Sequence, residues 1–156
     1  MIHGLMYGDL IQLAKDGEYE AIVHGCNCFC TMGAGIAKKI KQEFPVAYAV
    51  DQETIAGDKS KLGTYTFAHD PRYNVTVVNG YTQYYYRSKT SDVDYSAIQR
   101  VFAGMNEDPM FQGKAIGIPK IGAGLAGGDW EVIRKIINSV TPDLDIEVVA
   151  YKIYEL

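Results

Sequence analysis

The chain has 156 residues, of which 47% are hydrophobic and 22% charged, as is typical of one soluble globular domain. Its formal net charge of −4 excludes a globally basic surface for nucleic acid or for an acidic membrane. An anionic ligand would therefore have to be bound by local dipoles. No repeat, linker or low-complexity tract divides the sequence, so we expect a single domain over residues 1–156.

Three cysteines, Cys26, Cys28 and Cys30, alternate along one short segment. This pattern suits neither a disulfide framework nor a two-pair zinc site. We expect a small apolar surface, with a reactive thiol near a ligand as the alternative. No apolar run approaches the roughly 20 residues of a membrane span, and the first ten residues do not resemble a signal peptide. We therefore expect a cytoplasmic protein with no membrane partner. We also expect no metal and no cofactor.

Strand-like and helix-like segments alternate along the chain. The expected elements of the first half are a strand at Met1–Tyr7, a helix at Leu10–Lys15, a strand at Glu20–Gly25, a helix from Gly35 that Pro45 interrupts, and a helix at Val46–Ile55. Those of the second half are strands at Gly63–Ala68 and Asn74–Tyr81, a helix marked by Tyr95, Ile98, Phe102 and Met105, a strand at Lys114–Pro119, a helix at Trp130–Val140 and a strand at Glu147–Tyr154. This alternation predicts a three-layer α/β/α sandwich with a mixed, largely parallel central sheet.

Two glycine-rich loops, Met32–Ile36 and Ile121–Gly128, each lead from a predicted strand into a predicted helix. Ligands of such sheets bind at the carboxyl ends of the strands. Glycine brings backbone N–H groups close to a ligand, and a helix start adds unpaired donors and partial positive charge. Either loop alone is more typical of a tight turn, but the pair favours a diphosphate held from both sides. Neither carries the phosphate-loop lysine or a full dinucleotide fingerprint, so ATP hydrolysis and nicotinamide-dependent dehydrogenation are disfavoured.

The motifs and their order resemble the macro domain family over essentially the whole chain. They are Gly8-Asp9-Leu10, Val23–Asn27, Met32–Ala37, Val78–Gln83 and Ile118–Leu125. The chain is most similar to the branch that contains ADP-ribose 1''-phosphate phosphatases and terminal ADP-ribose glycohydrolases. The resemblance implies that ADP-ribose or ADP-ribose 1''-phosphate is the ligand.

The resemblance also implies roles for individual residues. Asp9, next to Leu10, would accept a hydrogen bond from the adenine amino group; a helix N-cap is the other interpretation, and the two roles are compatible. Asn27 would contact the distal ribose, with a turn cap as the alternative. The backbone N–H groups expected to hold the diphosphate and distal ribose belong to the first loop (Met32, Gly33, Ala34, Gly35, Ile36) and the second loop (Ile121, Gly122, Ala123, Gly124, Leu125).

Further polar and aromatic residues follow the strand that ends near Tyr81. We expect Asn79, Thr82 and Gln83 to contact the proximal ribose or shape the adenine pocket, with turn hydrogen bonding as an equal alternative. We interpret the aromatic run Tyr81, Tyr84, Tyr85 and Tyr86 as strand and packing material, with a wall for adenine or ribose as the alternative.

Catalysis is harder to assign. Glycohydrolases of this branch use a lysine and an aspartate at positions where this chain has Gly80 and Ala126, so their lysine mechanism is not expected here. Asp129 is a candidate general base toward a water that attacks a terminal phosphate, and a helix N-cap is the competing interpretation. Asn27 and Asp129 are thus the predicted catalytic residues. We expect His24 to be a packed, hydrogen-bonded histidine.

The leading hypothesis is a phosphatase that converts ADP-ribose 1''-phosphate to ADP-ribose and phosphate. One alternative is an ADP-ribose binding module without chemistry. Another is a hydrolase that removes ADP-ribose from protein or nucleic acid.

Overall fold

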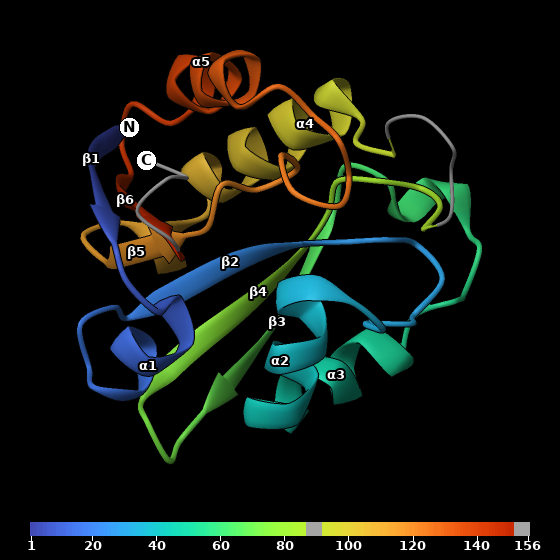
Figure 1. Cartoon of the computed structure of the whole chain (residues 1–156), viewed down its shortest axis with the longest axis horizontal. Helices are drawn as coiled ribbons and strands as arrows, with labels where there is room; N and C mark the ends of the chain where they lie inside the picture. The colour runs from blue at the N-terminus through green and yellow to red at the C-terminus, as the bar shows by residue number, and fades with distance from the viewer. Residues whose placement is uncertain (87–91, 152–156) are drawn as a thin grey trace.

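The computed structural model describes residues 1–86 and 92–151 and consists of a six-stranded sheet between two layers of helices (Figure 1). The strands are β1 (Ile2–Tyr7), β2 (Ala21–Cys26), β3 (Tyr65–Asp70), β4 (Val75–Tyr81), β5 (Ala115–Ile118) and β6 (Asp145–Ala150). The helices are α1 (Leu10–Lys15), α2 (Gly35–Glu43), α3 (Pro45–Gln52), α4 (Tyr95–Glu107) and α5 (Trp130–Val140), with short 3-10 turns η1 (Lys59–Lys61) and η2 (Pro109–Phe111). The predicted sandwich is confirmed. No helix of these two described segments is long and apolar enough to cross a membrane.

The strand order is β1-β6-β5-β2-β4-β3, and every neighbouring pair is parallel except β3 with β4. β3 is antiparallel because a tight turn joins it directly to β4. Asn74 occupies that turn with a φ of +53°, a conformation that asparagine tolerates better than most residues. The sheet is therefore mixed and largely parallel, as predicted.

Each face of the sheet is covered by helices whose apolar residues recur at helical spacing. Helices α1, α2 and α3 cover one face and α4 and α5 the other (Figure 1). Ile40 and Phe44 are fully buried on the first face, and Ile133 and Ile137 on the second. The apolar stripes predicted for these helices thus form the two halves of the core.

The last strand begins and ends earlier than predicted. It spans Asp145–Ala150 instead of starting at Glu147, because Asp145 already pairs with Ala115 in the sheet. Residues 152–154 of the predicted strand lie outside the described residues.

The two central strands, β2 and β5, separate toward their carboxyl ends. They pair only where Ala21 meets Ile116 and Ile22 meets Gly117. The chain leaves β2 for α2 on one face and leaves β5 for α5 on the opposite face. This divergence is the topological switch point at which parallel sheets form a ligand crevice.

Candidate functional site

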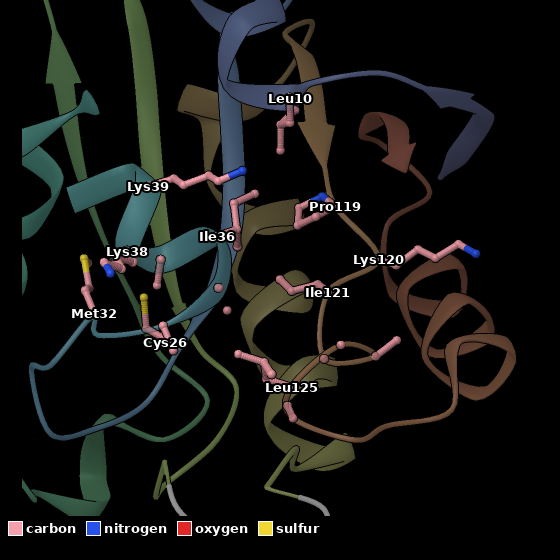
Figure 2. Close-up of a pocket in the computed structure, with 18 of the residues that line it drawn as sticks. Leu10, Cys26, Met32, Ile36, Lys38, Lys39, Pro119, Lys120, Ile121 and Leu125 are labelled. Atoms are coloured by element: carbon pink, nitrogen blue, oxygen red, sulfur yellow. The ribbon is translucent and has the colours of Figure 1, made fainter. Parts of the chain in front are cut away.

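A cleft of about 1370 Å³ opens at this switch point, between the two glycine-rich loops (Figure 2). It is larger than the roughly 300–1,000 Å³ of ordinary small-molecule sites, so it can accommodate an extended ligand. The predicted site residues that line it are Asp9, Leu10, Asn27, Met32, Gly33, Ala34, Gly35, Ile36, Gln83, Ile121, Gly122, Ala123, Gly124 and Leu125. Figure 2 shows Ile36 and Leu125 on opposite walls, with Leu10 at one end.

The cleft runs across the carboxyl edge of the sheet. One end, above β1 and β6, is lined by Asp9 and Val149. The glycine-rich loops line its middle, above β5 and β2. The other end lies beside the chain that follows β4 and includes Gln83 and Tyr86. The geometry therefore suits an elongated ligand whose anionic part is central.

The first glycine-rich loop ends in a helix that has no side-chain cap. Ala34 is the N-cap residue of α2, in extended conformation, and the first helical bond runs from the Lys38 N–H to the Ala34 carbonyl at 3.3 Å. Within the described segments, the N–H groups of Gly35, Ile36 and Ala37 donate no hydrogen bond, and all three residues line the cleft. These unpaired donors and the helix dipole form an anion site, and Lys38, Lys39 and Lys120 also line the cleft (Figure 2).

The second glycine-rich loop is folded on itself. Gly122 has a φ of +76°, and the Gly128 N–H donates to its carbonyl at 2.8 Å. A Cβ on Gly128 would lie 2.6 Å from that carbonyl oxygen, so Gly128 is required by packing. The N–H groups of Gly124 and Leu125 donate no bond to the described part of the chain, and both residues line the cleft. They are candidate phosphate donors on the second wall.

The two loops approach each other across the cleft. Leu125 is 78% exposed, and its Cδ1 would lie 3.3 Å from a Cβ placed on Gly35. Gly35 has a φ of +59°, which also favours glycine. A ligand diphosphate could therefore contact donors of both loops at once.

Asp9 and Asn27 combine the two interpretations that their sequence positions allow. Asp9 caps α1, because its Oδ1 accepts from the N–H groups of Ile11 at 3.1 Å and Gln12 at 3.2 Å, and it also lines the cleft. The Asn27 Oδ1 accepts from the Phe29 N–H at 2.8 Å, and its Nδ2 donates to Thr31 Oγ1 at 2.7 Å. This turn holds Asn27 at the cleft wall. The contacts to adenine and ribose remain predictions.

The structure corrects the expected placement of Asn79. Its side chain is fully buried and hydrogen-bonded to Ala47 O at 3.0 Å, to Thr66 Oγ1 at 3.1 Å and to His24 Nε2 at 2.7 Å. Asn79 does not line the cleft, because its side chain packs under α3, where it donates to the Ala47 carbonyl. His24 is the packed, hydrogen-bonded histidine that we predicted, and burial lowers its pKa to about 4.

Thr82 also lies behind the cleft rather than in it. It is 1% exposed, and its Oγ1 would lie 2.7 Å from a Cβ on Gly25, a residue of the cleft floor. Of the three polar residues expected from this segment, Gln83 is therefore the one that reaches the cleft.

Asp129 is placed as a helix cap and not as a cleft residue. It is exposed, and its Oδ1 accepts from the Glu131 N–H at 2.9 Å at the start of α5. It is absent from the cleft wall, which includes its neighbours Gly128 and Trp130. This corrects the expectation that its carboxylate faces a bound ligand, because the first turn of α5 holds the side chain.

Two further carboxylates line the cleft, those of Asp51 and Asp92, and neither was predicted from the sequence. Asp51 is buried, and its Oδ1 accepts from the Tyr81 hydroxyl at 2.7 Å; burial raises the pKa of this carboxyl. The Asp92 N–H donates to the Ala126 carbonyl of the second loop at 2.9 Å. Neither residue stands in a local motif, so only the fold brings them to the site.

The three cysteines differ in environment. Cys26 and Cys28 are buried in an apolar cluster with Met32 and Tyr81, as predicted, and burial raises the pKa of both thiols. Cys30 is half-buried and is not part of that cluster. Residues 1–86 and 92–151 contain no group of His, Cys, Asp or Glu that could hold a metal ion.

The chain belongs to the Macro domain family, whose sequence profile matches residues 23–137. It is 32% identical over 97% of its length to an uncharacterized 17.5 kDa protein of Enterobacteria phage T4, covering 98% of that protein. It is 26% identical over 92% of its length to a DNA ADP-ribosyl glycohydrolase of Mycobacterium tuberculosis, covering 40% of it. A 43-residue stretch, 28% of the chain, is 49% identical to an ADP-ribose 1''-phosphate phosphatase of Aspergillus oryzae and covers 20% of that protein.

Solved structures agree with this fold. The macrodomain of Mycobacterium tuberculosis DarG superposes with a TM-score of 0.72 at 20% identity, covering 93% of this chain and 96% of that one. Thermosipho africanus DarTG in complex with ADP-ribose superposes with a TM-score of 0.74 at 17% identity, covering 95% and 42%.

Proposed function

We propose that this chain binds ADP-ribose with its diphosphate between the two glycine-rich loops. The observation that carries the proposal is the pair of facing donor sets, the uncapped N-terminus of α2 and the N–H groups of Gly124 and Leu125. Such donors bind a diphosphate through aligned dipoles, which is consistent with a chain of net charge −4. The length of the cleft matches a ligand with a group on each side of the diphosphate.

The polar ends of the cleft support one orientation of the ligand. Asp9 would bind the adenine amino group at the end above β1 and β6 through the carboxylate oxygen that does not cap α1. Asn27 would contact the distal ribose on the other side of the loops. The C1'' position then faces the end of the cleft that Gln83 and Tyr86 line.

The first candidate reaction is hydrolysis of ADP-ribose 1''-phosphate. Water attacks the terminal phosphorus, the bond from phosphorus to the C1'' oxygen breaks, and inorganic phosphate and ADP-ribose result. Similarity to the Aspergillus phosphatase supports this reaction. Because Asp129 does not line the cleft, Asp92 replaces it as the proposed general base, with Asn27 orienting the ribose.

The second candidate reaction is the removal of ADP-ribose from a macromolecule, in which water replaces the group linked at C1''. Similarity to the DNA ADP-ribosyl glycohydrolases over 92% of the chain favours a nucleic acid over a protein as that group. The chain spans 40% of those relatives, and their activity as whole proteins is carried over only as a proposal.

The test is calorimetry with ADP-ribose, followed by turnover assays on ADP-ribose 1''-phosphate and on ADP-ribosylated DNA and protein. We expect binding, and loss of turnover in Asp92→Asn by roughly 10²–10⁴-fold. Asp129→Asn is the matched control, since it removes a carboxylate outside the cleft. Absence of ADP-ribose binding by folded protein would overturn the proposal. Binding without turnover on any substrate would leave a binding module.

A further inference from the structure

Four aromatic rings form a cluster beside the cleft, which we call the aromatic platform: Phe29, Tyr84, Tyr85 and Tyr86. Phe29 lies at its centre, with the ring centroids of the three tyrosines at 5.0, 5.3 and 5.9 Å in edge-to-face geometry. The sequence interpretation as packing material holds for Tyr81, which is fully buried, and for Tyr84, which is half-buried. It is incomplete for Tyr85 and Tyr86, which remain 44% and 38% exposed.

The platform is held rigidly by its backbone and by one hydroxyl. The Tyr84 hydroxyl donates to the Gly57 carbonyl at 2.7 Å, and the Cys28 N–H donates to the Tyr84 carbonyl at 3.0 Å. Gln83 Nε2 donates to the Tyr85 carbonyl at 2.8 Å. These bonds hold the Tyr84 ring and the backbone that carries Tyr85, so this backbone loses little conformational entropy when a partner binds the exposed rings.

The position of the platform relates it to the bound ligand. Tyr86 lines the cleft at the end opposite Asp9, on the chain that follows β4. If adenine lies at Asp9 and the distal ribose at Asn27, a group attached to C1'' leaves the cleft next to these rings. This step rests on the proposed function.

We infer that the aromatic platform binds unpaired bases of a nucleic acid that carries ADP-ribose at the cleft. The members of the platform are all aromatic, and aromatic faces stack on nucleobases of any sequence. The Lys59 ammonium lies over the Tyr84 ring, 5.4 Å from its centroid, which places a cation within the platform that a backbone phosphate could contact. Paired bases are already stacked within a duplex, so the occupant is single-stranded.

The acidic character of the chain sharpens this inference. With a net charge of −4, the protein has no broad basic surface to track a phosphate backbone. Recognition therefore depends on stacking next to the ADP-ribose, and the binding should vary only weakly with salt. A peptide linked to the same ADP-ribose lacks the series of adjacent nucleobases that a single strand presents to these rings.

The test compares four probes by fluorescence anisotropy, read before turnover: free ADP-ribose by competition, a single-stranded DNA octamer with one ADP-ribosylated base, the same octamer in a duplex, and an ADP-ribosylated octapeptide. We expect the single-stranded octamer to bind most tightly. Tyr85→Ala should weaken octamer binding on the order of tenfold and leave ADP-ribose binding unchanged, because Tyr85 does not line the cleft.

Two variants serve as controls. Tyr85→Trp should retain octamer binding, because indole stacks as well as phenol does. Phe67→Ala removes an aromatic ring that is 46% exposed on β3, outside the platform, and should have no effect.

Three results would overturn the inference. They are equal affinity for the octamer and free ADP-ribose, octamer binding that Tyr85→Ala does not change, and tighter binding of the peptide than of the octamer. If free ADP-ribose does not bind, the proposed function fails and the inference fails with it. If free ADP-ribose binds but Tyr85→Ala leaves octamer binding unchanged, the inference alone fails, so the two failures are distinguishable.

Discussion

Both glycine-rich loops connect a parallel strand to a helix, but the two helices begin differently. The α2 helix follows Ala34, which has no side chain to cap it, whereas the α5 helix follows Asp129, whose carboxylate accepts from the Glu131 N–H. In the first loop the helix N-terminus is open to a ligand. In the second, the helix N-terminus is already occupied, so only N–H groups of the loop itself can serve.

This difference shows how an anion site is distinguished from a structural turn of similar sequence. An N-terminal carboxylate neutralises the helix dipole and satisfies N–H groups that an anion would otherwise bind. A glycine-rich loop that enters a helix is therefore a stronger candidate for phosphate binding when the cap residue is apolar. Three experiments test this comparison.

The largest effect is expected from Ala34→Asp, which would make the start of α2 resemble that of α5. A carboxylate at this position should accept from the free N–H groups of Ile36 and Ala37 and repel the diphosphate. We expect ADP-ribose affinity to fall on the order of a hundredfold, since like charges a few ångströms apart in a partly shielded cleft repel by several kcal/mol. Calorimetry measures this change.

Ala34→Asn is the matched control for that experiment, because it caps the helix without adding charge. It should weaken binding less than Ala34→Asp, and thermal melting should show both variants to be at least as stable as the parent. Unchanged affinity in Ala34→Asp would contradict the assignment of the α2 N-terminus as the anion site.

The next largest effect is a loss of stability. It shows which glycines of the second loop are required by packing. A Cβ on Gly128 would lie 2.6 Å from the Gly122 carbonyl oxygen, whereas a Cβ on Gly124 would meet nothing within 4 Å. Gly128→Ala should lower the free energy of unfolding by about 1–3 kcal/mol, as overpacked sites do. Gly124→Ala should not, and denaturant unfolding compares the two. Equal destabilisation of both variants would refute this account of the loop.

The smallest effect concerns the cap of α5. Asp129→Ala removes the hydrogen bond to the Glu131 N–H and should cost about 1 kcal/mol of stability, the typical value for a lost N-cap. ADP-ribose affinity and turnover should stay at parent values. Asp94→Ala, which uncaps α4 away from the cleft, is the matched control. If Asp129→Ala abolished turnover while the control did not, Asp129 would be catalytic after all.

The sequence predicted most of the fold because the signals are local. The 3.6-residue spacing of Ile133 and Ile137, and of Ile40 with Phe44, corresponds to buried helix faces in the structure. Strand boundaries were less accurate, as at Asp145, because pairing partners come from distant parts of the chain.

The backbone donors of the site were predicted better than its polar side chains, because only the donors depend on local sequence. Backbone donors in glycine-rich loops depend on local conformation, and both loops line the cleft. The direction of a single polar side chain depends on its packed neighbours, which sequence spacing does not specify. Asn79 is hydrogen-bonded to three partners inside the core, although it lies within a family motif. Asp129 caps its own helix, although it follows a family motif closely.

The sequence by itself determined the alternation of strands and helices, the two loops that could hold a diphosphate, and the resemblance that orders them. Those properties follow from residue type and spacing within one segment. Only the tertiary structure decided which carboxylates reach the cleft, that Asp51 and Asp92 replace Asp129 there, and that aromatic rings stand at its far end. Such arrangements arise where β2, β4 and β5 bring distant loops to one edge of the sheet, and no single segment encodes them.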